Sequence, residues 1–170
     1  ARHNTHFMSG YVHKAYPPIY SALARQAGFA SAMFMRGVEG GTIPSLQQAG
    51  RLFSYYAEGE LVQRDLSPEE VSIQATSRAV PLPADLPEPP VEEGIVLPVD
   101  GNALAEAAAH QGMAALNGEQ GMMYDSLVYA GAIALTHLQR VETMSAAADA
   151  VRGVLDSGAA LERFKAAAEV

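Results

Sequence analysis

The chain has 170 residues, of which 49% are apolar and 18% are charged, with a net charge of -8 at pH 7. This length and composition are typical of one globular domain with its own core and exclude an intrinsically disordered chain. The acidic net charge disfavours binding to nucleic acid, because the phosphate backbone repels it.

Two further features of the composition restrict the class of protein. The chain contains no cysteine, which excludes disulfides, thiolate metal sites and a cysteine nucleophile, and gives no support to an oxidising compartment. No stretch approaches the ~18 apolar residues that a membrane-spanning helix needs. We therefore expect one α/β domain over residues 1–170, located in the cytoplasm and without a membrane span.

The first third of the sequence predicts a β-α-β unit. Residues 7–13 and 30–35 have the apolar character of buried strands, and Pro17 and Pro18 mark the start of the helix between them. The two strands are expected to be parallel, so both end on the same side of the sheet. Ligands of open α/β sheets bind beyond these carboxyl ends, which makes this edge the first place to look for a site.

The middle of the chain predicts a hairpin followed by a long connection. Residues 51–66 form two extended segments around Glu58 and Gly59, and Ser67 with Glu70 has the order of a helix capping box. Residues 81–100 are crowded with proline, which excludes a helix there and predicts an extended surface loop with a strand at residues 95–97.

Residues 102–170 are rich in alanine and are predicted to be helical. Asn102 is expected to cap a helix that Asn117 and Gly118 end. Further helices are expected over residues 122–140, from Thr143 onward, and in a last short segment near the end of the sequence. The predicted fold class is α/β, with a partial, mostly parallel sheet containing the β-α-β unit and the hairpin, followed by a C-terminal run of alanine-rich helices.

The order of these elements and several short motifs carry a family resemblance. The segment LNGEQGMMYD at residues 116–125, the ending VRGVLDSGAALERFKAAAE and the hairpin followed by LSPEE resemble the anthranilate phosphoribosyltransferases of glycosyltransferase family 3. The resemblance implies an α/β domain like those of nucleoside phosphorylases and phosphoribosyltransferases. It also implies transfer of a pentosyl group from phosphoribosyl pyrophosphate to a nitrogen acceptor.

The segment RGVEGGTIPSL at residues 36–46 departs from the main pattern of that family. The family carries an Asp-Glu pair that helps to hold magnesium on the pyrophosphate, and this sequence has Thr42 and Ile43 at the matching positions. The segment resembles a divergent branch of the family, some of whose members bind nucleic acid. We therefore expect magnesium with phosphoribosyl pyrophosphate only in the complete protein, and no metal site on this chain alone.

The family's phosphate-binding loop, Gly-Thr-Gly-Gly-Asp, and its helical N-terminal domain are both absent from these 170 residues. The resemblance then implies a fragment or subunit that is inactive alone and is completed by a second chain or by a preceding segment. A homodimer remains open. The alternative is a non-catalytic scaffold of the same fold that binds nucleic acid, a metabolite or a partner chain.

The candidate ligand-binding residues follow the two predicted parallel strands, and no catalytic residue is identified. These candidates are His13, Lys14, Arg36, Gly37, Glu39, Gly40 and Gly41. Arg36 suits a bidentate contact with phosphate, and the three glycines suit a turn whose N–H groups face an anion. The simpler alternatives are a loop salt bridge for Arg36 and Glu39, a hydrogen-bonded loop histidine and a plain glycine turn.

The remaining histidines give no metal site. His3 and His6 lie three residues apart but have no third ligand nearby in the sequence. His110 and His137 lie among alanine and leucine in predicted helices, where packing or surface exposure is the expected role.

Overall fold

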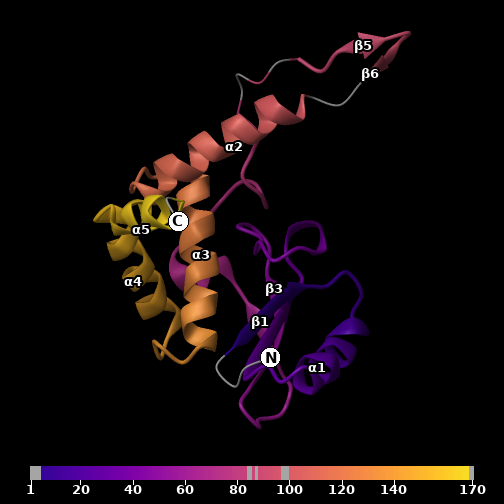
Figure 1. Ribbon diagram of the computed structural model, residues 1–170, viewed down its shortest axis with the longest axis vertical. Coiled ribbons are helices and arrows are strands. Elements are labelled where there is room, and N and C mark those ends of the chain that lie inside the picture. The colour runs from indigo at the N-terminus through magenta and orange to yellow at the C-terminus, as the bar shows by residue number, and fades with distance from the viewer. Residues whose placement is uncertain (1–4, 84–85, 87, 97–99, 169–170) are drawn as a thin grey trace.

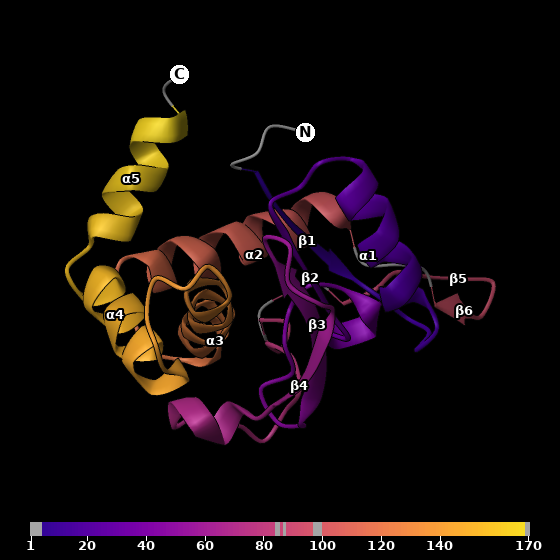
Figure 2. The same ribbon diagram turned by 90° about the horizontal axis from the view of Figure 1, so that it is seen from below.

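The computed structural model describes residues 5–83, 86, 88–96 and 100–168. A four-stranded sheet lies between helix α1 on one face and the helices α3 and α4 on the other (Figures 1 and 2). The strands are β1 (His6–Gly10), β2 (Ser31–Met35), β3 (Gly50–Tyr56) and β4 (Val62–Leu66). The helices are α1 (Tyr16–Gln26), α2 (Gly101–Leu116), α3 (Met122–His137), α4 (Met144–Asp156) and α5 (Ala159–Ala168).

The sheet is mixed, with the strand order β1-β2-β3-β4. Strands β1 and β2 are parallel, as the β-α-β pattern predicted, but β2 with β3 and β3 with β4 are antiparallel. The α/β class is confirmed, whereas the expectation of a mostly parallel sheet was wrong. The reason is that the predicted hairpin continues the same sheet beside β2, so it contributes two antiparallel pairs.

Strand β1 is shorter than the predicted residues 7–13. The last pair of its ladder joins Gly10 to Met35, and Tyr11 N–H donates one more hydrogen bond to the Met35 carbonyl. Beyond that point β2 has ended, so the chain has no partner strand and turns away. His13 and Lys14 therefore lie in the β1–α1 loop and not at the end of a strand.

Alternate residues of β2 enter two separate apolar cores, which explains why this strand is buried along its whole length. Ala32 and Phe34 face α1, in a core that also contains Tyr11, Ala24 and Tyr55. Met33 and Met35 face the helical layer. That larger core is completed by side chains of β3, β4 and the helices, chiefly Leu52, Leu66, Val71, Tyr124, Val128, Tyr129, Ala132, Ile133, Met144, Ala147 and Ala148.

The ends of the helical elements mostly follow the predicted signals. The capping box at Ser67 and Glu70 is confirmed at a short 3-10 helix (Pro68–Val71), and Asn117 and Gly118 end α2. Asp100, not Asn102, caps α2: its carboxylate accepts a hydrogen bond from the Asn102 N–H. Helix α3 ends at His137, before the predicted Arg140, because Gln139 adopts a left-handed conformation with φ 54°.

The proline-rich connection contains a small hairpin, β5 (Val91–Glu92) with β6 (Ile95–Val96), which lies apart from the main sheet (Figure 1). Glu93 and Gly94 both have positive φ, as a two-residue hairpin turn requires. The predicted strand at residues 95–97 is present over its first two residues, and residue 97 lies outside the described residues. In the described part of the chain, no helix has the length and apolar character to cross a membrane.

Candidate functional site

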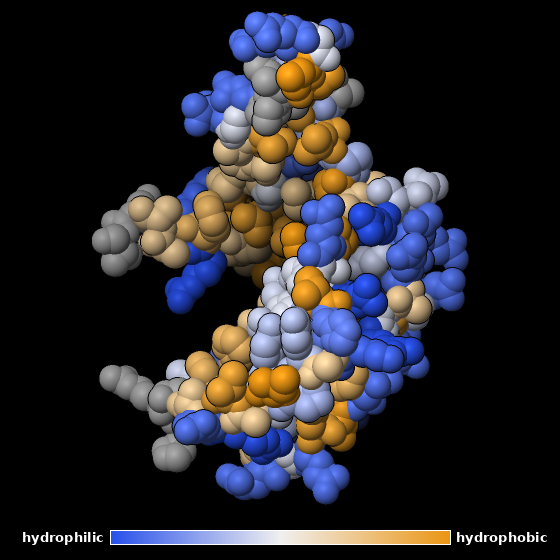
Figure 3. All heavy atoms as spheres, turned by 90° about the vertical axis from the view of Figure 1, so that its right-hand side faces the viewer, coloured by the Kyte–Doolittle hydropathy of each residue, from blue (hydrophilic) through white to orange (hydrophobic). Residues whose placement is uncertain are grey.

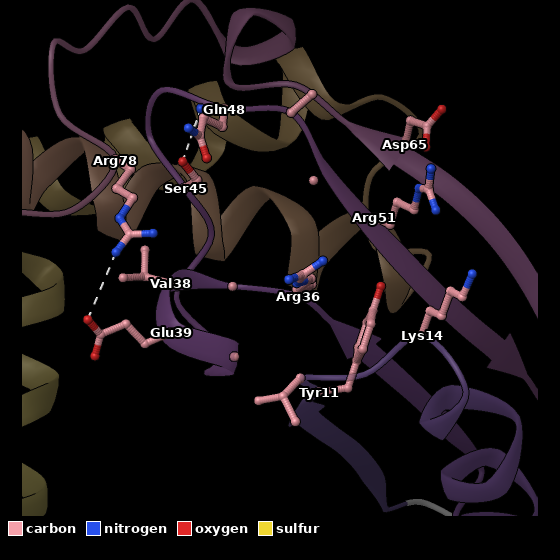
Figure 4. A pocket seen from close by; sticks show the side chains of 15 residues that line it. Tyr11, Lys14, Arg36, Val38, Glu39, Ser45, Gln48, Arg51, Asp65 and Arg78 are labelled. Atoms are coloured by element: carbon pink, nitrogen blue, oxygen red, sulfur yellow. Dashed lines mark hydrogen bonds and ion pairs between the residues drawn. The ribbon is translucent and has the colours of Figure 1, made fainter.

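A cavity opens at the carboxyl ends of β1 and β2. Its volume is about 830 Å³, and its walls come from the β1–α1 loop, the loop after β2, the adjoining ends of β3 and β4, and Arg78 (Figure 4). The space-filling view shows one face of the molecule, on which hydrophilic residues gather at mid-height on the right and hydrophobic residues gather in the upper middle (Figure 3). The cavity therefore lies where open α/β sheets bind their ligands.

Cations predominate around this cavity although the protein is acidic. Lys14, Arg36, Arg51 and Arg78 line it, against the carboxylates of Glu39 and Asp65. The contrast extends along the chain: residues 1–80 contain seven Lys or Arg and six Asp or Glu, whereas residues 81–170 contain four and thirteen. The excess of negative charge thus belongs to the second half of the sequence, whereas the residues that line the cavity all come from the first half.

Three of the four cations have no acceptor in the described residues. No carboxylate lies within 4.0 Å of Lys14, Arg36 or Arg51, and their side chains make no hydrogen bond there. Arg78 approaches Glu39 at 4.0 Å, which is a weak pair because both side chains are exposed. Arg51 and Asp65 are cross-strand neighbours in the β3–β4 ladder, yet they form no ion pair.

Tyr11 adds a neutral donor to this set of cations. Its ring packs edge-on against Phe53 and points into the cavity, where Lys14, Arg36 and Arg51 surround its hydroxyl end (Figure 4). Burial raises the pKa of the Tyr11 hydroxyl, and the charges of Arg36 and Arg51 offset part of that rise. The hydroxyl therefore keeps its proton at neutral pH and can donate a hydrogen bond to an anion.

The glycine-rich loop after β2 forms a closed turn. The N–H groups of Gly37 and Gly40 donate to the carbonyls of Gly41 and Gly37, and those of Val38 and Gly41 donate to Ile43 and Val38. These N–H groups are therefore not free to face an anion. The plain turn, which was the simpler alternative, describes this loop, and its part in the site is to place the side chains on either side.

The close packing of this loop requires glycine at two positions. A Cβ on Gly10 would collide with the Gly40 carbonyl and lie 2.7 Å from the carbonyl carbon of Gly41. Gly40 has φ +79° and lies against the side chain of Val12. The end of β1 and the glycine turn are thus in direct contact, which fixes the distance between the two loops that form the cavity.

The structure brings together five of the seven residues predicted for the site. Lys14, Arg36, Gly37, Glu39 and Gly40 line the cavity. His13 and Gly41 are not part of its lining. The His13 ring instead accepts a hydrogen bond from the Ala15 N–H and packs on Tyr16, as the alternative of a hydrogen-bonded loop histidine predicted. A ligand contact by any of these residues stays a prediction.

Sequence reasoning missed Tyr11, Arg51, Asp65 and Arg78. A signal existed for Arg51, because the first strand of a hairpin that pairs antiparallel with β2 must start at the carboxyl end of β2. Arg78 had no such signal, since it is positioned by the Leu46 N–H, which donates to its carbonyl from the far end of the glycine-rich loop.

A second polar cluster lies at the opposite ends of β1 and β2. The buried hydroxyl of Ser31 is 2.8 Å from His6 Nδ1 and 2.9 Å from His137 Nε2. Burial lowers the pKa of His137, and the nearby His6 lowers it further. The two histidines do not form a metal site, and within the described residues no group of three or more His, Asp or Glu is suited to hold a metal ion.

Comparison with known proteins adds a relation in fold only. No protein-family model matches the chain, and no curated protein matches it significantly. Among solved structures, anthranilate phosphoribosyltransferase from Saccharomyces cerevisiae in complex with 4-fluoroanthranilate matches with a TM-score of 0.65 at 15% identity. The same enzyme in complex with phosphoribosyl pyrophosphate and magnesium matches with a TM-score of 0.63 at 12% identity.

A third structure, anthranilate phosphoribosyltransferase from Thermus thermophilus, has a TM-score of 0.55 at 18% identity. These matches cover 95%, 95% and 92% of this chain and 41%, 40% and 41% of the respective enzymes. The chain thus spans about two-fifths of the length of the enzymes that it resembles. It has the fold of a part of the anthranilate phosphoribosyltransferases, as the sequence motifs implied.

Proposed function

We propose that this chain supplies the phosphate-binding side of a phosphoribosyltransferase-like protein. The observation that supports the proposal is the set of side chains around the cavity. Lys14, Arg36 and Arg51 are donors without acceptors among the residues that the structure describes, and the Tyr11 hydroxyl lies among them. Arginine and lysine can only donate, so the ligand has to provide several acceptor oxygens with negative charge. A phosphate or pyrophosphate group fits this requirement.

The reaction that fits this site is pentosyl transfer from phosphoribosyl pyrophosphate to a nitrogen acceptor, which makes the complete protein a glycosyltransferase. In that reaction the bond from the anomeric carbon to pyrophosphate breaks, a bond to nitrogen forms, and the acceptor nitrogen loses a proton. Positive charge fixed beside the departing pyrophosphate stabilises the transition state. Arg36 and Arg51 are the residues proposed for that role.

The proposal includes a further component of the protein. The matching enzymes are more than twice as long as the aligned part, and one of them is described with phosphoribosyl pyrophosphate and magnesium. We expect a preceding segment or a second chain to provide the glycine loop and the acceptor site, and we expect the assembly to work in the cytoplasm.

A non-catalytic scaffold is the second candidate. Thr42 and Ile43 favour it, because they stand where the related enzymes carry their acidic pair. Such a protein would bind an anionic metabolite, nucleic acid or a partner chain at the same cavity without transferring a pentosyl group. Binding of pyrophosphate by the chain would not separate the two candidates, whereas release of pyrophosphate from phosphoribosyl pyrophosphate by the complete assembly would.

The test of the proposed site is calorimetric titration of pyrophosphate into the 170-residue chain. We expect a Kd below about 1 mM, which corresponds to about -4 kcal/mol. The double variant Arg36→Gln/Arg51→Gln should weaken binding by at least about tenfold, since each arginine contributes charged hydrogen bonds. Arg163→Gln, an exposed arginine on α5, is the matched control. Equal affinity in the double variant and the control would contradict the site.

A further inference from the structure

We propose that the cavity binds pyrophosphate without magnesium, its arginines and lysine taking the place of the metal, and that magnesium weakens the binding. The inference rests on the proposed function and specifies how the ligand's charge is balanced. The inference comes from a difference between this chain and a protein of the same fold. One enzyme of this fold is described with phosphoribosyl pyrophosphate and magnesium. The cavity of this chain is instead lined by cationic hydrogen-bond donors, which suit an anion.

The carboxylates of the cavity are not arranged to hold a metal ion. Among the described residues that line it, the carboxylates are Glu39 and Asp65, and they lie on opposite sides of the cavity (Figure 4). Each faces an arginine: Glu39 is 4.0 Å from Arg78, and Asp65 is the cross-strand neighbour of Arg51. Magnesium on a phosphate ligand is usually held by one or two carboxylates together with phosphate oxygens and water. Here each carboxylate lies beside an arginine, whose positive charge opposes a metal ion at that place.

The positions that match the acidic pair of the related enzymes do not compensate. The side chains of Thr42 and Ile43 are not part of the cavity lining, and that of Ile43 is 56% exposed. The Ile43 carbonyl, which is the oxygen that this residue could offer, already accepts the Val38 N–H at 2.7 Å. The loop that would carry the metal ligands is therefore occupied with its own hydrogen bonds.

The cations around the cavity determine whether magnesium strengthens or weakens the binding of pyrophosphate. In the described part of the chain, Lys14, Arg36 and Arg51 have no carboxylate within 4.0 Å to offset their charge. A metal ion brought in on the ligand would therefore be repelled by all three. Magnesium bound to pyrophosphate also removes two negative charges from the ligand and occupies oxygens that the arginines would otherwise contact. Free pyrophosphate should be the better ligand for both reasons.

The experiment measures the Kd of pyrophosphate for the 170-residue chain by calorimetry in EDTA and in saturating magnesium, with the ionic strength held equal. We expect magnesium to raise the Kd by about fivefold or more. Titration of magnesium alone should give no binding heat. The variants Glu39→Gln and Asp65→Asn should bind metal-free pyrophosphate at least as tightly as the unchanged chain, because each removes a negative charge from the cavity.

Each outcome has a distinct meaning. Tighter binding in EDTA, kept in both carboxylate variants, supports the inference. Binding only in magnesium, lost in Glu39→Gln or Asp65→Asn, overturns it and leaves the proposed phosphate site intact. Binding in neither condition overturns the inference together with the proposed function, and no response of the Kd to magnesium overturns the inference alone.

Discussion

The two ends of the parallel pair β1 and β2 differ in how their polar groups are satisfied. At the amino ends, the Ser31 hydroxyl lies within hydrogen-bond distance of His6 and His137, so strand and helix are joined by a closed network. At the carboxyl ends, Lys14 and Arg36 extend into an open cavity without acceptors among the described residues. The amino ends of these two strands therefore form a structural contact, whereas their carboxyl ends form the candidate site.

This difference separates residues that stabilise the fold from residues that await a ligand. A closed network contributes to the free energy of unfolding, because breaking it leaves buried polar groups unsatisfied. Exposed cations without partners contribute little to stability, and their mutual repulsion lowers it slightly. Substitution of Ser31 or His137 at the amino ends should thus change stability and leave anion binding unchanged. Substitution of the cations at the carboxyl ends should change anion binding and leave stability nearly unchanged.

The largest effect is expected at Gly10, where one substitution should change both the stability of the fold and the binding of pyrophosphate. In Gly10→Ala the new methyl group would collide with the Gly40 carbonyl, so the glycine turn has to shift. We expect a loss of about 2–4 kcal/mol in the free energy of unfolding, as for other overpacked sites, together with weaker pyrophosphate binding. Urea unfolding measures the first and calorimetry the second. Gly112→Ala, whose added methyl meets nothing within 4 Å, is the control.

Ser31→Ala should break the hydrogen-bond network at the amino ends of β1 and β2 and leave the cavity unchanged. Ser31 is fully buried and serves both His6 and His137, so its removal should cost about 1–3 kcal/mol of unfolding free energy. The Kd for pyrophosphate should not change. A loss of pyrophosphate binding equal to that of the arginine double variant would contradict the separation of the two ends.

Lowering the pH should lower the free energy of unfolding through His137, which belongs to the network at the amino ends of β1 and β2. Burial lowers the pKa of His137 below its ordinary value of 6.5, so the unfolded chain binds more protons than the folded chain near pH 6. Stability is then present at neutral pH and is lost as the pH falls below about 6.5. Because His137 is partly exposed, the loss should stay below about 1 kcal/mol. The midpoints of urea unfolding between pH 7.5 and 5.5 measure this loss of stability. In His137→Asn the midpoint should depend less on pH, and His110→Asn is the control variant.

Lys14→Gln should have the smallest effect and should change binding only. The side chain is exposed and makes no hydrogen bond or ion pair within the described residues, so the free energy of unfolding should stay within about 0.5 kcal/mol. The Kd for pyrophosphate should rise by about threefold, as expected for one screened charge at the rim. A fall in stability without a change in the Kd would place Lys14 with the structural residues.

Local patterns in the sequence predicted most elements of the fold. The proline start of α1, the capping box at Ser67 and the Asn117-Gly118 stop depend on neighbouring residues, and all three are present. The end of β1 and the mixed character of the sheet depend on which strands pair. Residues 7–13 look equally extended throughout, and the strand ends only because β2 has no further residue to pair with.

The candidate site was predictable to the same extent. Lys14 and Arg36 follow the two parallel strands in the sequence, so the β-α-β pattern was enough to place them at one edge. Arg78 reaches the cavity through a contact with the loop after β2, and the Ser31–His137 pair joins residues 106 positions apart. Such long-range contacts leave no local signal, which is why His137 was expected only to pack or to lie on the surface.

The most direct test of the account is a crystal structure of the chain soaked in pyrophosphate without magnesium. The account predicts density for the anion in the cavity at the carboxyl ends of β1 and β2, with its oxygens in contact with Arg36, Arg51 and the Tyr11 hydroxyl. Pyrophosphate bound elsewhere on the molecule, with this cavity empty, would contradict it.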